Sequence, residues 1–417
     1  MRIPELLAPA GSMDALRAAL HFGADAVYVG MKRFGLRAFA GNFDPQELSE
    51  AVRLAHQADA RIYVTLNSYP FDDELEDFTA AARQAAELGV DAAIVADPGA
   101  VVLLRREVPE LPLHVSTQAN TVNAPGVRLY RDLGCERVIL AREMSLERIR
   151  NLRQRVGDGI QLETFVHGAS CMAYSGRCML SAYLTGRSGN RGECAQPCRW
   201  QYAVTEEKRP GEYLPVAEDE RGTYLFSARD LCLMPLLPDL CDAGVASLKI
   251  EGRMKTEYYV GVVTGAYRRG LDLLARGRDL FAEALPELME ELKCASHRLS
   301  DTGFLLGNPQ TPGEAEGFWQ TREYIARVLE ADGTDGTARL LLKNRFFAGD
   351  ELELMTASGI KRVTAKPFIR EKTGEKLDTL GVAGEVIRMA LPGCGPGDML
   401  RGPVRNHRPD SSRAGTP

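Results

Sequence analysis

The sequence lacks any run of about 18 or more consecutive apolar residues, which is the length that a membrane-spanning helix needs. Its first residues, Met1 to Glu5, do not combine a charged head with an apolar segment, so we expect no secretory signal peptide. We therefore expect a cytoplasmic protein that has no membrane partner.

An excess of positive charge is also absent. The chain has 51 lysines and arginines against 57 aspartates and glutamates, a formal net charge of −6. The overall charge therefore does not indicate a nucleic-acid binder, although local patches decide such contacts.

Two common hydrolase motifs are missing. None of the six histidines stands in the H-E-x-x-H pattern of a zinc metalloprotease, and no G-x-S-x-G nucleophile elbow occurs. These motifs therefore give no support to a metalloprotease or an α/β-hydrolase.

Cysteine is scarce, with nine among 417 residues, but it is unevenly distributed. Four cysteines lie in one stretch with six, fifteen and three residues between successive members: Cys171, Cys178, Cys194 and Cys198. Thiolates bind soft metals, and disulfides are rare in the cytosol, so the cluster indicates metal ligation rather than bridges. Zinc sites usually pair their cysteines two residues apart, and the looser spacing here favours an iron–sulfur cluster.

Cys232 is an alternative fourth ligand, but its apolar neighbours favour a buried structural cysteine. The remaining cysteines are expected to be packing residues: Cys135, Cys241, Cys294 and Cys394.

Short apolar runs alternate with amphipathic stretches through most of the chain. Ser12, Asp44 and Ser145 are placed to cap three of the expected helices. Repeated strand–helix units predict a parallel sheet, and eight units favour a closed (β/α)8 barrel over an open doubly wound sheet. The eight strand candidates are 5–8, 26–30, 61–66, 92–96, 113–116, 137–140, 162–166 and 247–250.

The fold class is thus α/β, with a TIM-like barrel and a second, smaller domain. We expect the barrel domain over 1–306, with a cysteine-rich insertion at about 168–235 between its seventh and eighth strands. A linker rich in glycine and proline follows over 307–322, and a disordered tail over 404–417. Between them, 323–403 reads as a small antiparallel β-barrel whose strands include 324–328, 338–342, 351–354 and 382–387.

The carboxyl ends of barrel strands carry the chemistry in this architecture. Lys249 and Glu251 share one strand face by alternation; facing inward they would bind something, and facing outward they would be ordinary solvated residues. His167 is a general acid or base, a neighbour of the metal cluster, or a structural imidazole. We predict catalytic roles for His167, Lys249, Glu251 and Arg253, and substrate contacts for Asn67, Gln118, Arg142, Glu163 and Arg177.

The residues around the cysteines resemble the signature of peptidase family U32, also called the collagenase-like protease family. The resemblance covers the chain from Glu5 to about Leu306 and includes a C-terminal β domain. The subgroup it is most similar to takes part in forming 5-hydroxyuridine in tRNA. The motifs that carry it are 163–171, 175–181, 191–200, 247–253 and 7–11.

The resemblance implies an RNA hydroxylase that forms 5-hydroxyuridine at the tRNA wobble position without oxygen, with prephenate as co-substrate. It also implies a 4Fe-4S cluster on Cys171, Cys178 and Cys194, with Cys198 as our choice for the fourth ligand. Family members acting on the ubiquinone ring place their fourth ligand further downstream, which keeps Cys232 open. The expected partners are tRNA, or ribosomal RNA as in members that hydroxylate a cytidine, and a paralogous family subunit.

Two other functions stay open at this point. One is a peptidase, as the family name says, although Cys171 cannot be both a cluster ligand and a free nucleophile beside His167. The other is an RNA-binding module whose partner does the chemistry. Residues 167–200 carry four arginines against one glutamate, and 361–376 carry six cations against two glutamates. The second stretch suits a phosphate backbone or is a solvated edge strand.

Overall fold

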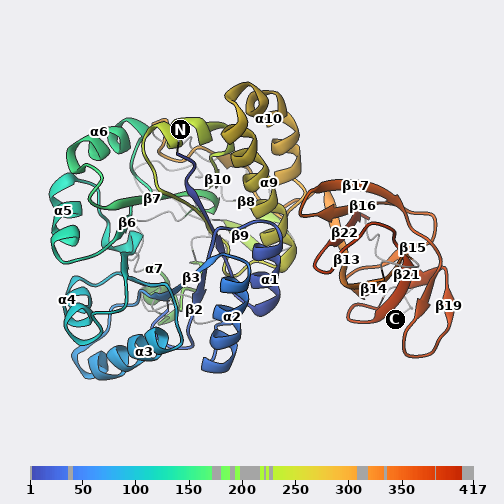
Figure 1. Ribbon diagram of the computed structural model, residues 1–417, viewed down its shortest axis with the longest axis horizontal. Helices are drawn as coiled ribbons and strands as arrows, with labels where there is room; N and C mark the ends of the chain where they lie inside the picture. The colour runs from blue at the N-terminus through green and yellow to red at the C-terminus, as the bar shows by residue number, and fades with distance from the viewer. Residues whose placement is uncertain are drawn as a thin grey trace, which may run out of the picture. The chain divides into compact units, whose positions relative to one another are not determined.

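The structure, a computed structural model, describes residues 2–35, 41–170, 180–187, 193–197, 217–219, 222–224, 229–307, 318–332, 336–380 and 382–405. The chain divides into two compact units (Figure 1). The first comprises Met1–Leu292 and His297–Phe318, and the second Lys293–Ser296 and Trp319–Pro417. Each unit is described by itself.

The first unit is a closed barrel of parallel strands, as the sequence predicts. The last barrel strand, β11, pairs in parallel with both β7 and β1, which closes the sheet and excludes the open doubly wound alternative. All eight predicted strand positions are confirmed. The barrel strands are β1 (Glu5–Pro9), β2 (Ala26–Gly30), β3 (Arg61–Leu66), β4 (Ala92–Val95), β5 (Leu113–Val115), β6 (Arg137–Ile139), β7 (Gln161–Ala169) and β11 (Ser247–Ile250).

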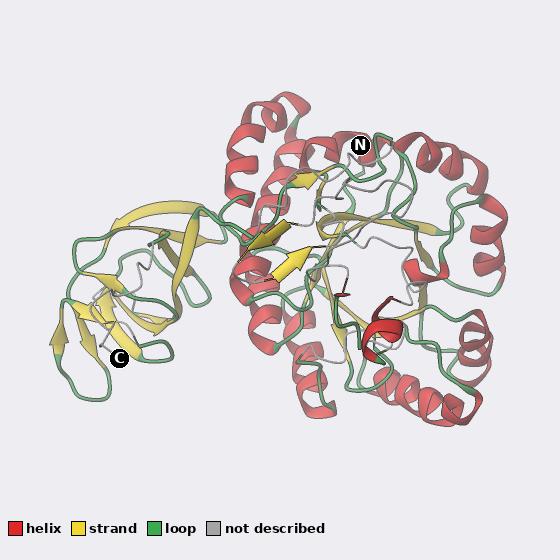
Figure 2. Ribbon diagram, turned by 180° about the vertical axis from the view of Figure 1, so that it is seen from behind, coloured by secondary structure: helices red, strands yellow, loops and turns green. Residues whose placement is uncertain are grey.

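Helices surround the strands as an outer ring (Figure 2). The predicted caps are confirmed: the side chains of Ser12, Asp44 and Ser145 each accept a backbone N–H of the first helical turn. The helices of this unit are α1 (Met13–His21), α2 (Pro45–Gln57), α3 (Leu75–Glu87), α4 (Pro98–Glu107), α5 (Ala124–Asp132), α6 (Leu146–Val156), α7 (Leu180–Thr185), α8 (Leu237–Asp242), α9 (Glu257–Arg276) and α10 (Arg278–Leu292).

An added strand marks where the insertion leaves and rejoins the barrel. Strand β10 (Asp230–Cys232) pairs antiparallel with β7, so that Asp230 lies opposite Ala169. Strand β12 (Ser300–Asp301) pairs with β10 on its other side. The two ends of the insertion therefore lie side by side. Within it, β8 (Ala217–Asp219) and β9 (Gly222–Tyr224) form a hairpin.

A buried ion pair fixes the point of return. Asp230 and Arg298 are both buried, and their side chains meet at 2.7 Å. The Arg298 backbone N–H also donates to the Asp230 carboxylate. A buried pair with several hydrogen bonds holds its two segments in one arrangement.

The second unit is an antiparallel sheet with its own apolar core. Its core includes Leu340, Phe346, Phe368 and Leu400, each fully buried. The strand order is β17 (Gly359–Thr364), β16 (Glu351–Thr356), β22 (Met399–Pro403), β13 (Arg322–Ala331), β14 (Thr337–Leu342), β21 (Val386–Ala390), β18 (Phe368–Arg370) and β19 (Lys376–Leu377). A separate ribbon pairs β15 (Phe346–Phe347) with β20 (Thr379–Leu380).

One predicted strand in this unit begins later than expected. The prediction over 382–387 is wrong for its first residues, because β21 starts at Val386. Gly384 has a φ of +88°, a conformation that glycine adopts readily in turns. The preceding residues therefore form a turn rather than extended backbone.

A membrane span is not found among the helices that the structure describes, since none is both long and apolar enough to cross a bilayer.

Candidate active site

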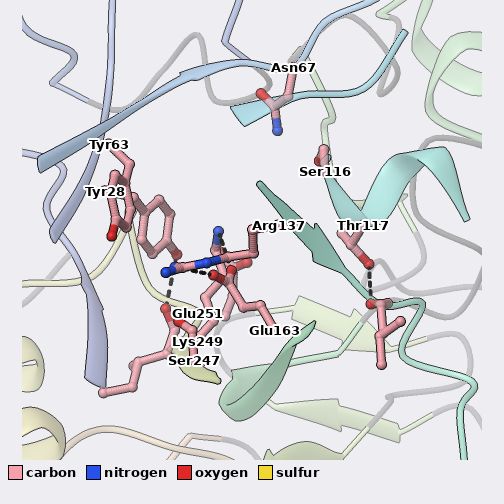
Figure 3. A network of polar contacts seen from close by, with 12 residues as sticks. Tyr28, Tyr63, Asn67, Ser116, Thr117, Arg137, Glu163, Ser247, Lys249 and Glu251 are labelled. Carbon is pink, nitrogen blue, oxygen red and sulfur yellow. Dashed lines mark hydrogen bonds and ion pairs between the residues drawn. The ribbon is translucent and has the colours of Figure 1, made fainter. Parts of the chain in front are cut away.

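A chain of alternating charges runs through the interior of the barrel (Figure 3). Arg137 donates to Glu5 at 2.6 Å and to Glu163 at 3.0 Å. The other Glu163 oxygen lies 3.2 Å from the Lys249 ammonium. Because Glu163 is fully buried, two cations share one carboxylate that has no contact with solvent.

Lys249 faces the barrel interior, which settles the alternatives left open by the sequence. Its Nζ lies 4.2 Å from the centroid of the Tyr28 ring and 5.7 Å from that of Phe165. Burial lowers the pKa of Lys249, and the Glu163 carboxylate opposes this effect without reversing it. The side chain is therefore a desolvated amine just below the carboxyl ends of the strands.

Arg142 joins three elements at the mouth of the barrel. Its guanidinium donates to the Ala169 carbonyl at 2.7 Å and to the Glu251 carboxylate at 3.2 Å. It also stacks 4.0 Å above the centroid of the Phe165 ring. The end of β7, where the insertion begins, is thus tied to the residue that follows β11.

Arg253 occupies space that two glycines leave open. Its Nη1 donates to the Thr65 hydroxyl at 2.9 Å. A Cβ added to Gly30 would lie 2.0 Å from this Nη1, and one added to Gly11 would lie 1.9 Å from the Arg253 carbonyl oxygen. Any side chain at either position would displace the arginine.

Asn67 and Gln118 form a second polar group at the mouth. The Asn67 amide donates to the Gln118 carboxamide oxygen at 2.7 Å, and the Ser116 hydroxyl donates to the same oxygen at 2.6 Å. Figure 3 shows Asn67 and Ser116 at neighbouring strand ends. This group and the Arg142–Glu251 pair contain the amides and charges available to bind a polar substrate.

The structure does not bring the His167 imidazole to these residues. Phe165 pairs with Lys249 and His167 with Ile250, so Val166 is an extra residue that interrupts the alternation of β7. The ring is buried, and its Nδ1 lies 3.4 Å from the Tyr267 hydroxyl of α9. Burial lowers the pKa of His167 to about 4, which keeps the ring neutral near pH 7.

Most of the predicted metal ligands lie outside the described residues: Cys171, Cys178 and Cys198, together with Arg177. Cys194 is described, and its Sγ accepts the Gln196 backbone N–H at 3.3 Å. Amide hydrogen bonds of this kind stabilise thiolates in metal sites, so this residue and the four-thiol donor set fit an iron–sulfur cluster. In the described part of the chain, no three metal-binding side chains converge.

Cys232 lies opposite His167 at the root of the insertion. It is buried, and this burial raises the pKa of its thiol, while the Tyr267 hydroxyl shares a hydrogen bond with it. A raised pKa describes the protonated thiol and leaves open whether a metal takes it as a ligand.

Sequence reasoning missed Arg137, Phe165 and Thr65. Arg137 begins an otherwise apolar strand, and a charged residue on the inward face of such a strand was the available signal. Phe165 and Thr65 gave none, because each is an ordinary strand residue whose role comes from its neighbours.

A polar cavity of about 420 Å³ opens at the opposite, amino-terminal end of the strands, lined by residues that include Glu5, Arg61 and Arg137. All five N–H groups of Arg137 are used by Glu5, Gln161 and Glu163. This end of a barrel usually serves stability rather than chemistry.

Comparison with known proteins gives matches along the whole chain. Residues 11–315 match the model of "Peptidase family U32" and residues 320–401 that of "Peptidase family U32 C-terminal domain". The "tRNA hydroxylation protein P" of Escherichia coli is 36% identical over 93% of this chain and 94% of its own length. The "tRNA hydroxylation protein P1" of Bacillus subtilis is 36% identical over 93% of this chain and 92% of its own.

A further relative acts on a different RNA by its name. The "23S rRNA 5-hydroxycytidine C2501 synthase" of Escherichia coli is 40% identical over 67% of this chain, but this match covers only 41% of the relative.

Proposed function

Because the chain belongs to peptidase family U32, and its relatives along nearly the full length are named for tRNA hydroxylation, we propose that it is an RNA-modifying hydroxylase. The proposed product is 5-hydroxyuridine at the wobble position of tRNA. The observation that carries the proposal is the match to the Escherichia coli protein over 94% of that protein's length.

The proposal includes a 4Fe-4S cluster held by Cys171, Cys178, Cys194 and a fourth thiolate. When bound, such a cluster supplies electron transfer. The support is the set of four clustered thiols and the amide hydrogen bond to Cys194. Cys198 is the proposed fourth ligand, and Cys232, at the root of the insertion, is the alternative.

The residues at the mouth have roles that follow from their contacts. The amides of Asn67 and Gln118 suit the hydrogen-bonding edge of a uracil ring. Arg142 and Glu251 fix the loop after β11 against the end of β7, and Lys249 presents a desolvated amine beneath them. The proposal also includes independence from molecular oxygen and prephenate as co-substrate.

Nucleoside analysis tests the proposal. The chain is expressed in bacteria lacking their own tRNA hydroxylation proteins, and digested tRNA is examined by mass spectrometry. We expect 5-hydroxyuridine to return with the native chain and to be absent with Glu251→Gln. Unchanged nucleosides in both tRNA and ribosomal RNA would contradict an RNA hydroxylase.

A second candidate is hydroxylation of a cytidine in ribosomal RNA, which the 23S rRNA relative favours. The same digest separates the two, because hydroxycytidine in ribosomal RNA would replace hydroxyuridine in tRNA as the product. Peptide cleavage that survives substitution of the four clustered cysteines would instead support the peptidase implied by the family name.

Iron content identifies the fourth ligand. Chains prepared without oxygen are compared as Cys198→Ser, Cys232→Ser and, as a control in the second unit, Cys394→Ser. We expect Cys198→Ser to lose iron and visible absorption while the other two retain them. Loss of iron in Cys232→Ser alone would give the role to Cys232, and an iron-free native chain would remove the cluster from the proposal.

A further inference from the structure

Two ion pairs on either side of the Phe165 ring each leave one buried atom without a hydrogen bond. Arg142 Nε is a buried donor that has no acceptor in the described part of the chain. Glu163 Oε1 is a buried acceptor without a hydrogen-bond donor, although the Lys249 ammonium lies 3.2 Å from it. Both pairs are therefore incompletely bonded.

Such atoms are rare in folded proteins because a buried polar group without a partner is costly, and a bound molecule is one explanation. The unsatisfied atom on Arg142 needs an acceptor, and that on Glu163 needs a donor. A carboxylate supplies the first and a hydroxyl group supplies the second. Lys249 offers further N–H donors, since Glu163 is the only oxygen that pairs with it.

The surroundings restrict the size of that molecule. The Lys249 side chain is 6% exposed and Glu163 is fully buried, which is too deep for the phosphate backbone of a polynucleotide. The rings of Phe165 and Tyr28 flank the ammonium and provide apolar surface for a carbon skeleton. The site is therefore suited to a small organic molecule.

We infer that Arg142, Phe165, Lys249 and Glu163 form the binding site of a small hydroxy acid that serves as co-substrate. The acid's carboxylate pairs with Arg142, its hydroxyl donates to Glu163, and Lys249 stabilises the negative charge from below. The inference rests on the proposed function and deepens it, because it places the co-substrate at the mouth beneath the RNA site.

Calorimetric titration of the full chain under anaerobic conditions tests the inference. The probes are prephenate, L-malate and inorganic phosphate, each titrated into the native chain, Arg142→Gln, Arg142→Lys and Lys249→Met. We expect prephenate to bind the native chain, and each variant to weaken its binding roughly 10-fold to 100-fold, as loss of a buried charged hydrogen bond does.

The matched control is Arg150→Gln, since Arg150 pairs with Asp239 at 2.8 Å on the exposed outer surface of the barrel. It should bind prephenate like the native chain. If Lys249→Met does not fold, as judged by circular dichroism, Arg142→Lys carries the test, because it retains the charge and loses the Nε donor.

The outcomes separate the sources of the ligand. L-Malate binding that depends on Arg142, without prephenate binding, would support the hydroxy-acid site and change the co-substrate. Phosphate as the only ligand would overturn the inference, as would prephenate binding that neither Arg142 nor Lys249 affects. Hydroxyuridine formation is measured separately, so the RNA product and the co-substrate site can fail independently.

Discussion

Glu163 is the residue on which the charges inside the barrel depend most. It is fully buried and contacts both Arg137 and Lys249. Removing one partner from a buried ion pair leaves an uncompensated charge, which costs much more than losing an exposed pair. Arg137 keeps Glu5, but Lys249 has no other carboxylate within ion-pair distance in the described chain.

Glu163→Gln should therefore lower the free energy of unfolding by about 3 kcal/mol or more. Urea denaturation followed by circular dichroism measures the change. Glu50→Gln is the control, because Glu50 pairs with Arg53 at 2.6 Å on the exposed surface of α2 and should change stability little. Equal effects of the two substitutions would show that the interior pair is not energetically special.

His114 gives the barrel a dependence on acid. It is buried, its ring lies edge-on to Tyr63 at 4.7 Å, and burial lowers its pKa well below 6.5, with Arg137 and Lys249 acting in the same direction. The unfolded chain takes up this proton as the pH falls below about 6.5, while the folded chain does not. Stability due to this residue is therefore present above that pH and is lost below it.

His114→Phe keeps an aromatic ring beside Tyr63 and removes the titration. We expect its free energy of unfolding to fall less than that of the native chain between pH 7.5 and pH 5.5. Urea titrations at several pH values compare the two slopes. Parallel slopes would mean that His114 takes up its proton equally in both states.

At the scale of elements, the loops that follow β1, β2 and β11 fit together only through glycine. Gly11 lies against the Arg253 carbonyl and Gly30 against its guanidinium. Gly168, at a φ of +104°, lies beneath the Glu251 carbonyl oxygen, which a Cβ would approach to 2.4 Å. The catalytic ends of these strands are thus packed backbone against backbone.

Gly11→Ala should displace the loop after β11, lower the unfolding midpoint and abolish RNA modification. Gly277→Ala is the control, because a Cβ there meets nothing within 4 Å. Thermal unfolding and nucleoside analysis of both variants test this. A Gly11→Ala chain with native stability and native modification would refute the requirement for close approach.

The sequence predicted elements well where local rules act. Ser12, Asp44 and Ser145 cap helices because a side-chain oxygen satisfies nearby N–H groups, and this depends on neighbours in the chain alone. The late start of β21 was missed because Val382 has strand propensity, whereas the turn at Gly384 depends on the pairing of β21 with β14.

At the scale of the whole molecule, the two units have separate cores. The core of the second unit includes Phe346 and Phe368, whose rings lie 4.8 Å apart, and both are fully buried. Separate cores allow separate unfolding transitions.

Phe368→Ala should cost about 3 to 5 kcal/mol in the second unit alone, because it leaves a cavity in that core. Differential scanning calorimetry should show one transition moving to lower temperature and the barrel transition unchanged. Joint movement of both transitions would show that the units unfold as one.

The sequence by itself determined the barrel, because alternating strands and helices with apolar strand bodies bury their faces in few other ways. It also determined that Lys249, Glu251, Arg142 and Asn67 lie at or near one end of that barrel, since parallel strands end at the same edge. These inferences need only periodicity and direction along the chain.

Only the tertiary structure decided which of these residues meet. The extra residue in β7 turned His167 away from the mouth, and the partner of Lys249 proved to be Glu163, a residue 86 positions earlier. Arg142 reached both Ala169 and Glu251 across three loops. Such contacts depend on register and side-chain length between distant segments, which no local pattern in a sequence encodes.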